Sequence, residues 1–299
     1  MGIGYGNALF LGSARRAGAR FDETVTIGRL GRNLTPRQLA RVAARFGISP
    51  ADATAAAAEE YAEPYLGRFL GARRVSSLDY SRYQGCDIVH DLNTPLDPTH
   101  HGRFDALIDG GSIEHVFNFP VAIESYMRLV KVGGRLFVFT VANNHCGHGF
   151  YQFSPELFFR ILGPDYGFRV DSVVLEVHPY PGADMGGRSR FYRVRDPQAV
   201  GERVALIGRR PCMIMVHAIK TGEPARWPGF PIQSDYVTLH RERADGGSGP
   251  PPASRGRLRD LAKRAYNALP IDLVNAVNGY RLRRRLSLSN RDYFEPWEP

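Results

Sequence analysis

Three aspartates, Asp79, Asp91 and Asp109, each end a short apolar run of the sequence. Turn or helix-start residues follow each of them, which is the pattern of parallel strands that carry acids at their carboxyl ends. Ligands of open α/β sheets bind in the crevice outside those ends. A carboxylate in that crevice can accept hydrogen bonds from both hydroxyls of a ribose. The three aspartates therefore indicate a site for a nucleoside-bearing cofactor.

A second group of polar side chains follows the apolar run 135–141. Its members are Asn143, Asn144, His145, His148, Tyr151 and Gln152. Loops at the active edge of a sheet often carry function, so we interpret this loop as substrate-binding. His145 or His148 is a candidate general base, because a histidine pKa of about 6.5 suits proton removal at neutral pH. In the alternative interpretation these histidines and Cys146 are metal ligands. No second cluster completes that set, so we predict no metal site.

Glu114 and His115 come shortly after the run that ends at Asp109. His115 would face the crevice there and is a third candidate base, whereas packing at a helix start is the alternative role. We predict that Glu114 binds substrate. Its alternative role is a first-turn acid that complements the helix dipole.

Alternating strand and helix signals predict a doubly wound α/β fold around these residues. Thr35, Pro36 and Gln38 form the N-terminal signal of a helix that ends before Gly47. Further helices are expected at residues 51–70, 119–132 and 155–161. Strands are expected at residues 24–28, at the runs that end at 79, 91 and 109, and at 135–141, 169–177 and 212–219.

The composition restricts the cellular compartment and the partners that we expect for this protein. The net charge is +9, the three cysteines are far apart, and no apolar run is long enough to span a membrane. Without a secretory signal, these features predict a cytoplasmic protein with reduced thiols. The aromatic residues near 227–236 lie among prolines rather than on a basic platform, so we predict no nucleic-acid partner.

The C-terminal region differs in composition from the rest. Residues 226–256 contain a Gly, Ser and Pro-rich linker, and residues 257–299 are Arg-rich with a basic amphipathic stripe. Such a segment could lie on an anionic membrane surface, which would make the protein peripheral, or bind a partner protein or the main domain. We therefore divide the chain into an extension (1–23), a main domain (24–225), the linker and the basic extension.

Two sequence motifs resemble those of class I S-adenosylmethionine-dependent methyltransferases, a family with a Rossmann-like fold. They are Ile-Asp-Gly-Gly-Ser-Ile-Glu-His-Val-Phe-Asn-Phe-Pro at residues 108–120 and Gly-His-Gly-Phe-Tyr-Gln-Phe-Ser-Pro-Glu-Leu at 147–157. The segment 128–139 also looks like the family's fourth helix and fifth strand. The resemblance covers residues 24–220 and implies a mostly parallel sheet that ends in an antiparallel strand pair.

The resemblance also implies roles for individual residues. Asp79 with Tyr80 would bind the ribose of S-adenosylmethionine, Asp91 and Leu92 the adenine, and Asp109 and Gly110 the methionine end. The family's first loop is an acid followed by Gly-x-Gly-x-Gly. Here the loop is degenerate and keeps two glycines flanked by arginines. Its cofactor-binding candidates are Gly28, Arg29 and Gly31.

These expectations converge on one function, methyl transfer from S-adenosylmethionine to an oxygen or nitrogen of a small molecule or glycan. The alternative is a non-catalytic methyltransferase-like module that binds a partner through its basic tail. A nucleotide-sugar enzyme would need Gly-x-Gly-x-x-Gly and Tyr-x-x-x-Lys, and neither occurs at the required place.

Overall fold

The computed structural model describes residues 2–179, 188–224, 229–237 and 270–299. They fall into two units, which we describe separately. The first contains residues 1–194, 209–231 and 296–299, and the second contains residues 195–208 and 232–295. Within the described ranges, no helix is both long and apolar enough to cross a membrane.

The first unit is built on one sheet whose strands lie in the order β9-β8-β10-β7-β6-β2-β4-β5. Strands β5, β4, β2, β6 and β7 are parallel, and β10 is inserted antiparallel between β7 and β8. The bounds are β2 Glu23–Ile27, β4 Arg74–Asp79, β5 Ile88–Val89, β6 Phe104–Asp109, β7 Val130–Asn143, β8 Phe168–Val177, β9 Arg190–Val194 and β10 Cys212–Lys220. The expected parallel sheet with a final antiparallel pair is therefore present.

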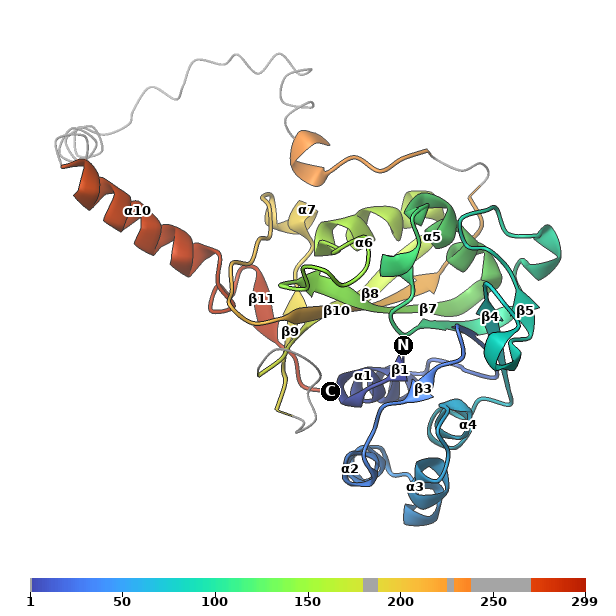
Figure 1. The fold of residues 1–299 in the computed structure, drawn as a ribbon. Helices are drawn as coiled ribbons and strands as arrows, with labels where there is room; N and C mark the ends of the chain where they lie inside the picture. The colour runs from blue at the N-terminus through green and yellow to red at the C-terminus, as the bar shows by residue number, and fades with distance from the viewer. Residues whose placement is uncertain (1, 180–187, 225–228, 238–269) are drawn as a thin grey trace. The chain divides into compact units, whose positions relative to one another are not determined.

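Helices cover both faces of the sheet, as a doubly wound fold requires. Helices α5 and α6 lie on one face, and α1, α2, α3 and α4 lie on the other side (Figure 1). The bounds are α1 Tyr5–Arg16, α2 Pro36–Phe46, α3 Pro50–Ala57, α4 Glu63–Leu70, α5 Phe119–Leu129 and α6 Pro155–Ile161.

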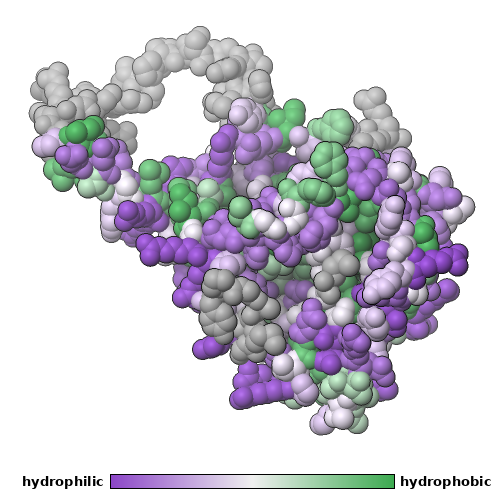
Figure 2. Space-filling model, in the orientation of Figure 1, coloured by the Kyte–Doolittle hydropathy of each residue, from purple (hydrophilic) through white to green (hydrophobic). Residues whose placement is uncertain are grey.

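The N-terminal residues belong to the core of this unit. Strand β1 (Gly2–Ile3) pairs in parallel with β3 (Gly31–Arg32), and α1 follows it directly. The Phe10 ring of α1 packs edge-on against Phe137 and Phe139 of β7. Residues assigned from the sequence to an extension thus supply a helix that covers the sheet. The face visible in Figure 2 is mostly hydrophilic, with hydrophobic residues in small separate groups.

Local signals predicted several boundaries correctly. The Thr35 hydroxyl accepts a hydrogen bond from the Gln38 backbone, the Gln38 side chain accepts one from the Thr35 backbone, and Gly47 ends α2 in the left-handed conformation. The prediction of one continuous helix over residues 51–70 is wrong, because two helices, α3 and α4, occupy this segment. Pro64 supplies the physical reason, since proline is tolerated in a helix's first turn but not in its interior.

Two further predictions about strands need correction. The strand that was expected to end at Asp91 contains only Ile88 and Val89, so Asp91 lies in the turn beyond it. Strand β9, which pairs antiparallel with β8, was not predicted. Its sequence Arg-Phe-Tyr-Arg-Val alternates too briefly between apolar and charged residues to stand out.

The second unit includes the short helix α7 (Pro197–Val200) and the longer α10 (Ile271–Arg285). The Tyr293 hydroxyl donates to Glu202 Oε1 at 2.6 Å, and Arg285 binds both side chains. A short strand, β11, covers Phe294–Pro296. The amphipathic stripe predicted at 257–269 and most of the predicted linker lie outside the described residues.

Candidate functional site

The carboxyl ends of three neighbouring strands, β4, β2 and β6, are aligned at one edge of the sheet, and β7 continues beyond them to Asn143. Ile27 of β2 is opposite Leu78 of β4 and Asp109 of β6, and Asp109 is in turn opposite Val138 of β7. The residues that follow these strands therefore meet at this edge, as the sequence analysis expected.

Asp79 lies at this edge as the last residue of β4. Its side chain is half-buried, and Oδ1 accepts a long hydrogen bond of 3.4 Å from the Ser81 backbone. Within the described part of the chain this is the only hydrogen bond to the Asp79 carboxylate, so most of its acceptor capacity is unused. Tyr80, the next residue, is 74% exposed.

Asp91 and Leu92 lie in the turn beyond β5. Asp91 Oδ1 accepts hydrogen bonds of 2.9 Å from the backbone and the side chain of Asn93. The backbone hydrogen bond from Asn93 is the main reason that the pKa of Asp91 is lowered, so the carboxylate stays ionised. Leu92 is nearly buried beside it.

Asp109 has a different environment from the other two aspartates. It is fully buried, and its carboxylate accepts hydrogen bonds from the backbone of Gly111, Ser112 and Ile113 and from the Tyr126 hydroxyl. Burial, followed by the negative charge of Glu114, raises the pKa of Asp109 to about 7. This carboxylate organises the turn after β6 and is not exposed at the edge.

The degenerate first loop after β2 is held tightly. Gly28 has a φ of 67°, and its N–H donates to the Leu78 carbonyl of β4 at 2.7 Å. Arg29 forms a 2.6 Å ion pair with Glu63 and lies over the ring of Tyr61. Arg32 donates to backbone carbonyls around the end of α3. Both arginines are thus committed to the segment between α3 and α4.

Gly110, where the resemblance expects the methionine end of the cofactor, is closely packed. A Cβ atom at Gly110 would lie 2.8 Å from Leu30 Cδ2 and 3.3 Å from the Gly2 nitrogen. The Gly2 N–H also donates to the Gly110 carbonyl at 3.2 Å. Strand β1 and the first loop therefore fill the space against this glycine, while Gly31 pairs with Gly2.

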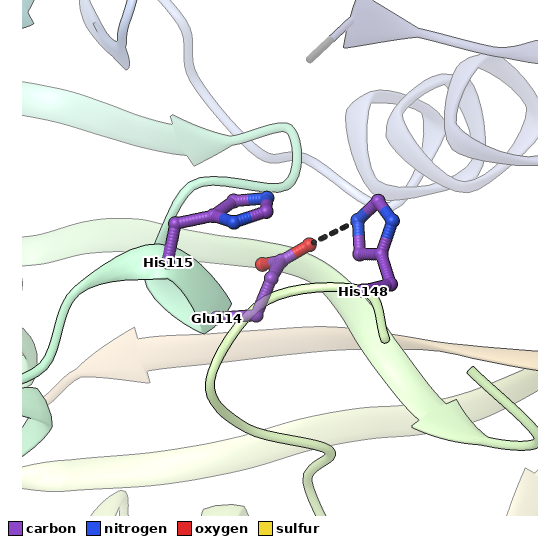
Figure 3. Close-up of side chains that lie close together, drawn as sticks. All are labelled: Glu114, His115 and His148. Atoms are coloured by element: carbon purple, nitrogen blue, oxygen red, sulfur yellow. Dashed lines mark ion pairs between the residues drawn. The ribbon is translucent and has the colours of Figure 1, made fainter. Parts of the chain in front are cut away.

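On the other side of β6, Glu114 lies at the centre of a cluster with two histidines (Figure 3). Glu114 belongs to the 3-10 turn Ile113–His115 and is fully buried. Its Oε2 accepts a 2.8 Å hydrogen bond from Thr140 Oγ1 of β7. Its Oε1 lies 3.5 Å from His148 Nε2, and the rings of His115 and His148 are 5.1 Å apart.

The loop after β7 folds over this cluster. Asn143 is the last residue of β7, and the Asn144 side chain donates to the Arg210 carbonyl at 2.9 Å. The His145 backbone donates to Gln152 Oε1 at 2.9 Å, and the Tyr151 hydroxyl donates to the Phe117 carbonyl at 2.6 Å. The contact between His145 and Gln152 closes the loop on itself, and the other two contacts join the loop to the segments that carry Arg210 and Phe117.

His145 is the most sheltered of the three histidines. Burial lowers its pKa, and the neighbouring charges of His178 and His148 add to that effect. Its ring centroid lies 6.1 Å from that of His148. The structure thus brings together all three histidines that were predicted to be candidate bases, and it keeps His145 neutral at physiological pH.

The complete burial of the Glu114 side chain was not predicted from the sequence. The available signal was Thr140, a single hydroxyl in the otherwise apolar run from Leu136 to Ala142. A buried hydroxyl needs a hydrogen-bond partner. Glu114 provides that partner from the neighbouring strand's end.

Comparison with known proteins gives structural similarities only: no family model matches the chain, and no curated protein matches it. An S-adenosylmethionine-dependent methyltransferase structure from Thermotoga maritima aligns at 15% identity and a TM-score of 0.38, over 71% of this chain and 88% of that one. The 1,6-didemethyltoxoflavin-N1-methyltransferase of Burkholderia thailandensis aligns at 13% identity and 0.38, over 72% and 78%. At these scores the likeness does not establish a shared family.

Proposed function

We propose that this protein transfers a methyl group from S-adenosylmethionine to an oxygen or nitrogen of a small molecule or glycan. The observation that carries the proposal is the position of Asp79. Its carboxylate is largely uncommitted at the carboxyl end of β4, next to the glycine turn that follows β2. This is the place at which an open α/β sheet binds the ribose of a nucleoside.

We assign the nucleoside half of S-adenosylmethionine to the residues at the ends of β4 and β5. Asp79 would hold the ribose hydroxyls, and Asp91 with Leu92 would offer an ionised acceptor and an apolar surface to the adenine. When bound, the cofactor supplies an electrophilic methyl group on its sulfonium. The chain's own contribution is then mainly to position the acceptor, which in favourable cases is worth about 7–11 kcal/mol.

The acceptor would lie over the loop after β7. His145 is a suitable base because it is neutral at physiological pH, and His115 and His148 lie beside it. Asn143, Asn144, Tyr151 and Gln152 are the proposed substrate contacts, whereas Glu114, which was predicted from the sequence to bind substrate, is fully buried and is not among them. A general base of this kind contributes about 10²–10⁴-fold when the acceptor is a hydroxyl.

One specific observation favours the second candidate, a non-catalytic module with the same fold. Leu30 and Gly2 fill the space against Gly110, where the methionine end would lie. Binding of the whole cofactor therefore requires β1 to move away from Gly110. A protein in which β1 stays in place would keep the fold without the activity.

We expect Asp79→Ala to weaken the binding of S-adenosylhomocysteine at least about tenfold, because a charge-assisted hydrogen bond to the ribose is worth about 1.4 kcal/mol or more. Titration calorimetry on the full chain measures this directly. Asp97→Ala is the matched control, since Asp97 is an exposed aspartate whose Oδ1 accepts from the Thr99 backbone at 2.8 Å. Equal affinity of wild type and Asp79→Ala would refute the ribose role, and no binding by the wild type would favour the module.

A further inference from the structure

We propose that Glu114, His115 and His148 form a binding site for a divalent metal ion of the zinc type. One ligand atom from each residue lies within 4.8 Å of the other two. Two imidazoles and one carboxylate make the donor set that zinc uses in catalytic sites, where further positions remain open. This differs from the set of His145, Cys146 and His148 considered from the sequence, because Glu114 is its centre.

The Glu114 carboxylate has one oxygen that needs a partner. Glu114 is fully buried, and among the described residues its Oε1 accepts no hydrogen bond although this atom is shielded from water. A buried carboxylate oxygen without a donor is costly. A cation bound at Oε1 would remove that cost, and His148 Nε2 lies 3.5 Å from this atom.

Glu114 is held by hydrogen bonds to its side chain and its backbone, whereas the two histidines are exposed. Thr140 fixes Oε2, and the Glu114 carbonyl accepts hydrogen bonds from the backbone of Phe150 and Tyr151. His115 and His148 are exposed. An ion with bonds of about 2.0–2.2 Å needs ligand atoms about 3–3.5 Å apart. Rotation of the two exposed rings toward Glu114 supplies the remaining contraction.

The backbone of the loop that carries His148 is shaped to bring this histidine close to Glu114. Asn144, Gly147 and Gly149 all have positive φ values, of 60°, 90° and 74°. A Cβ atom on Gly149 would lie 2.7 Å from the Glu114 carbonyl oxygen. Only glycine allows this approach, so the sequence His-Gly at 148–149 places an imidazole directly over the buried carboxylate.

The open coordination positions would face solvent, since both histidines are exposed. An ion there would bind water or the oxygen of an acceptor and make its proton easier to remove. His145, which is not part of the set, would then remain as the base. Metal binding itself does not depend on the proposed methyl transfer and can be measured without cofactor or acceptor.

The test uses the full chain after chelator treatment, titrated with Co²⁺ by absorption spectroscopy and with Zn²⁺ by calorimetry. We expect one ion per chain, with cobalt bands typical of nitrogen and oxygen ligands. Glu114→Gln, His115→Ala and His148→Ala should each lower the affinity on the order of 100-fold. Thr140→Val, which only positions Glu114, should lower it about 10-fold while keeping one ion per chain.

Matched controls separate this site from its alternatives. Cys146→Ser and His100→Ala should bind Zn²⁺ like the wild type. If Glu114→Gln does not fold, the exposed His115→Ala and His148→Ala variants decide the question. The proposal is overturned if the wild type shows no saturable binding, or if Cys146→Ser abolishes binding while His115→Ala does not. The first of these results would leave a plain ion pair between Glu114 and His148.

Discussion

Asp109→Ala should lower the free energy of unfolding by about 3–5 kcal/mol, measured by denaturant unfolding of the full chain. The substitution removes the acceptor for three backbone N–H groups and for the Tyr126 hydroxyl, all around a fully buried carboxyl group. Each buried donor without an acceptor costs about 1–3 kcal/mol, and partial entry of water recovers some of the sum.

The effect should also depend on pH, with a definite sign. The pKa of Asp109 is about 7 in the folded protein against an ordinary value of 3.8. Between these values the folded state holds a proton that the unfolded state has released, so this group's contribution to stability falls as pH rises. The stability difference between wild type and Asp109→Ala should therefore be larger at about pH 4 than at about pH 7.5.

Asp97→Ala provides the control for both measurements. Asp97 also accepts a backbone hydrogen bond, from Thr99, but it is exposed, so water can replace it. We expect a loss of about 1 kcal/mol or less. If Asp109→Ala costs no more than this control, the turn after β6 does not depend on the buried carboxyl group.

Lys220→Met should lower the free energy of unfolding by about 2–4 kcal/mol, again by denaturant unfolding. Lys220 is the last residue of β10 and is almost fully buried. Its ammonium group donates to the carbonyls of Met127 and Val130 at 3.0 and 2.9 Å, at the C-terminal end of α5, and also pairs with Glu223. Methionine keeps the aliphatic stem buried, so the loss measures the charge and its hydrogen bonds.

Lys131→Met is the matched control for Lys220. Lys131 pairs with Asp105 at 3.1 Å, but its side chain is 38% exposed. Exposed ion pairs contribute about 0–1 kcal/mol. Comparable losses in the two variants would mean that the carbonyls at the end of α5 are satisfied by water and not by the buried ammonium group.

The fold could be predicted from local signals because those signals act over a few residues. The capping residues of α2 and the apolar runs of β2, β4, β6 and β7 are each sufficient to define an element. The break between α3 and α4 is hard to predict, because the alanines of 51–58 favour a helix strongly and Pro64 is a single opposing residue. When helix propensity is summed over many residues, one residue that ends the helix changes the total very little.

The site could be predicted only in part, because side-chain direction depends on the third dimension. Asp79 and Asp109 end the two strands that flank β2, and they look alike in sequence. The Asp79 carboxylate lies at the edge of the sheet, whereas the Asp109 carboxylate lies in the turn after β6. The positions of Tyr126 and of the 111–113 backbone decide this difference. The two histidines next to Glu114 come from segments far apart in sequence, so their proximity follows from the register of β6 and β7.

The insertion of β10 between β7 and β8 constrains the order of events during synthesis. The ribosome releases β7 and β8 before β10, the strand that pairs with both of them. Each of the two strands therefore has an unpaired edge until Cys212–Lys220 emerges. Such edges attract other extended chains. Slowing translation just after β8 should therefore increase coaggregation, and a chaperone that shields open strand edges at that stage should raise the yield of native protein.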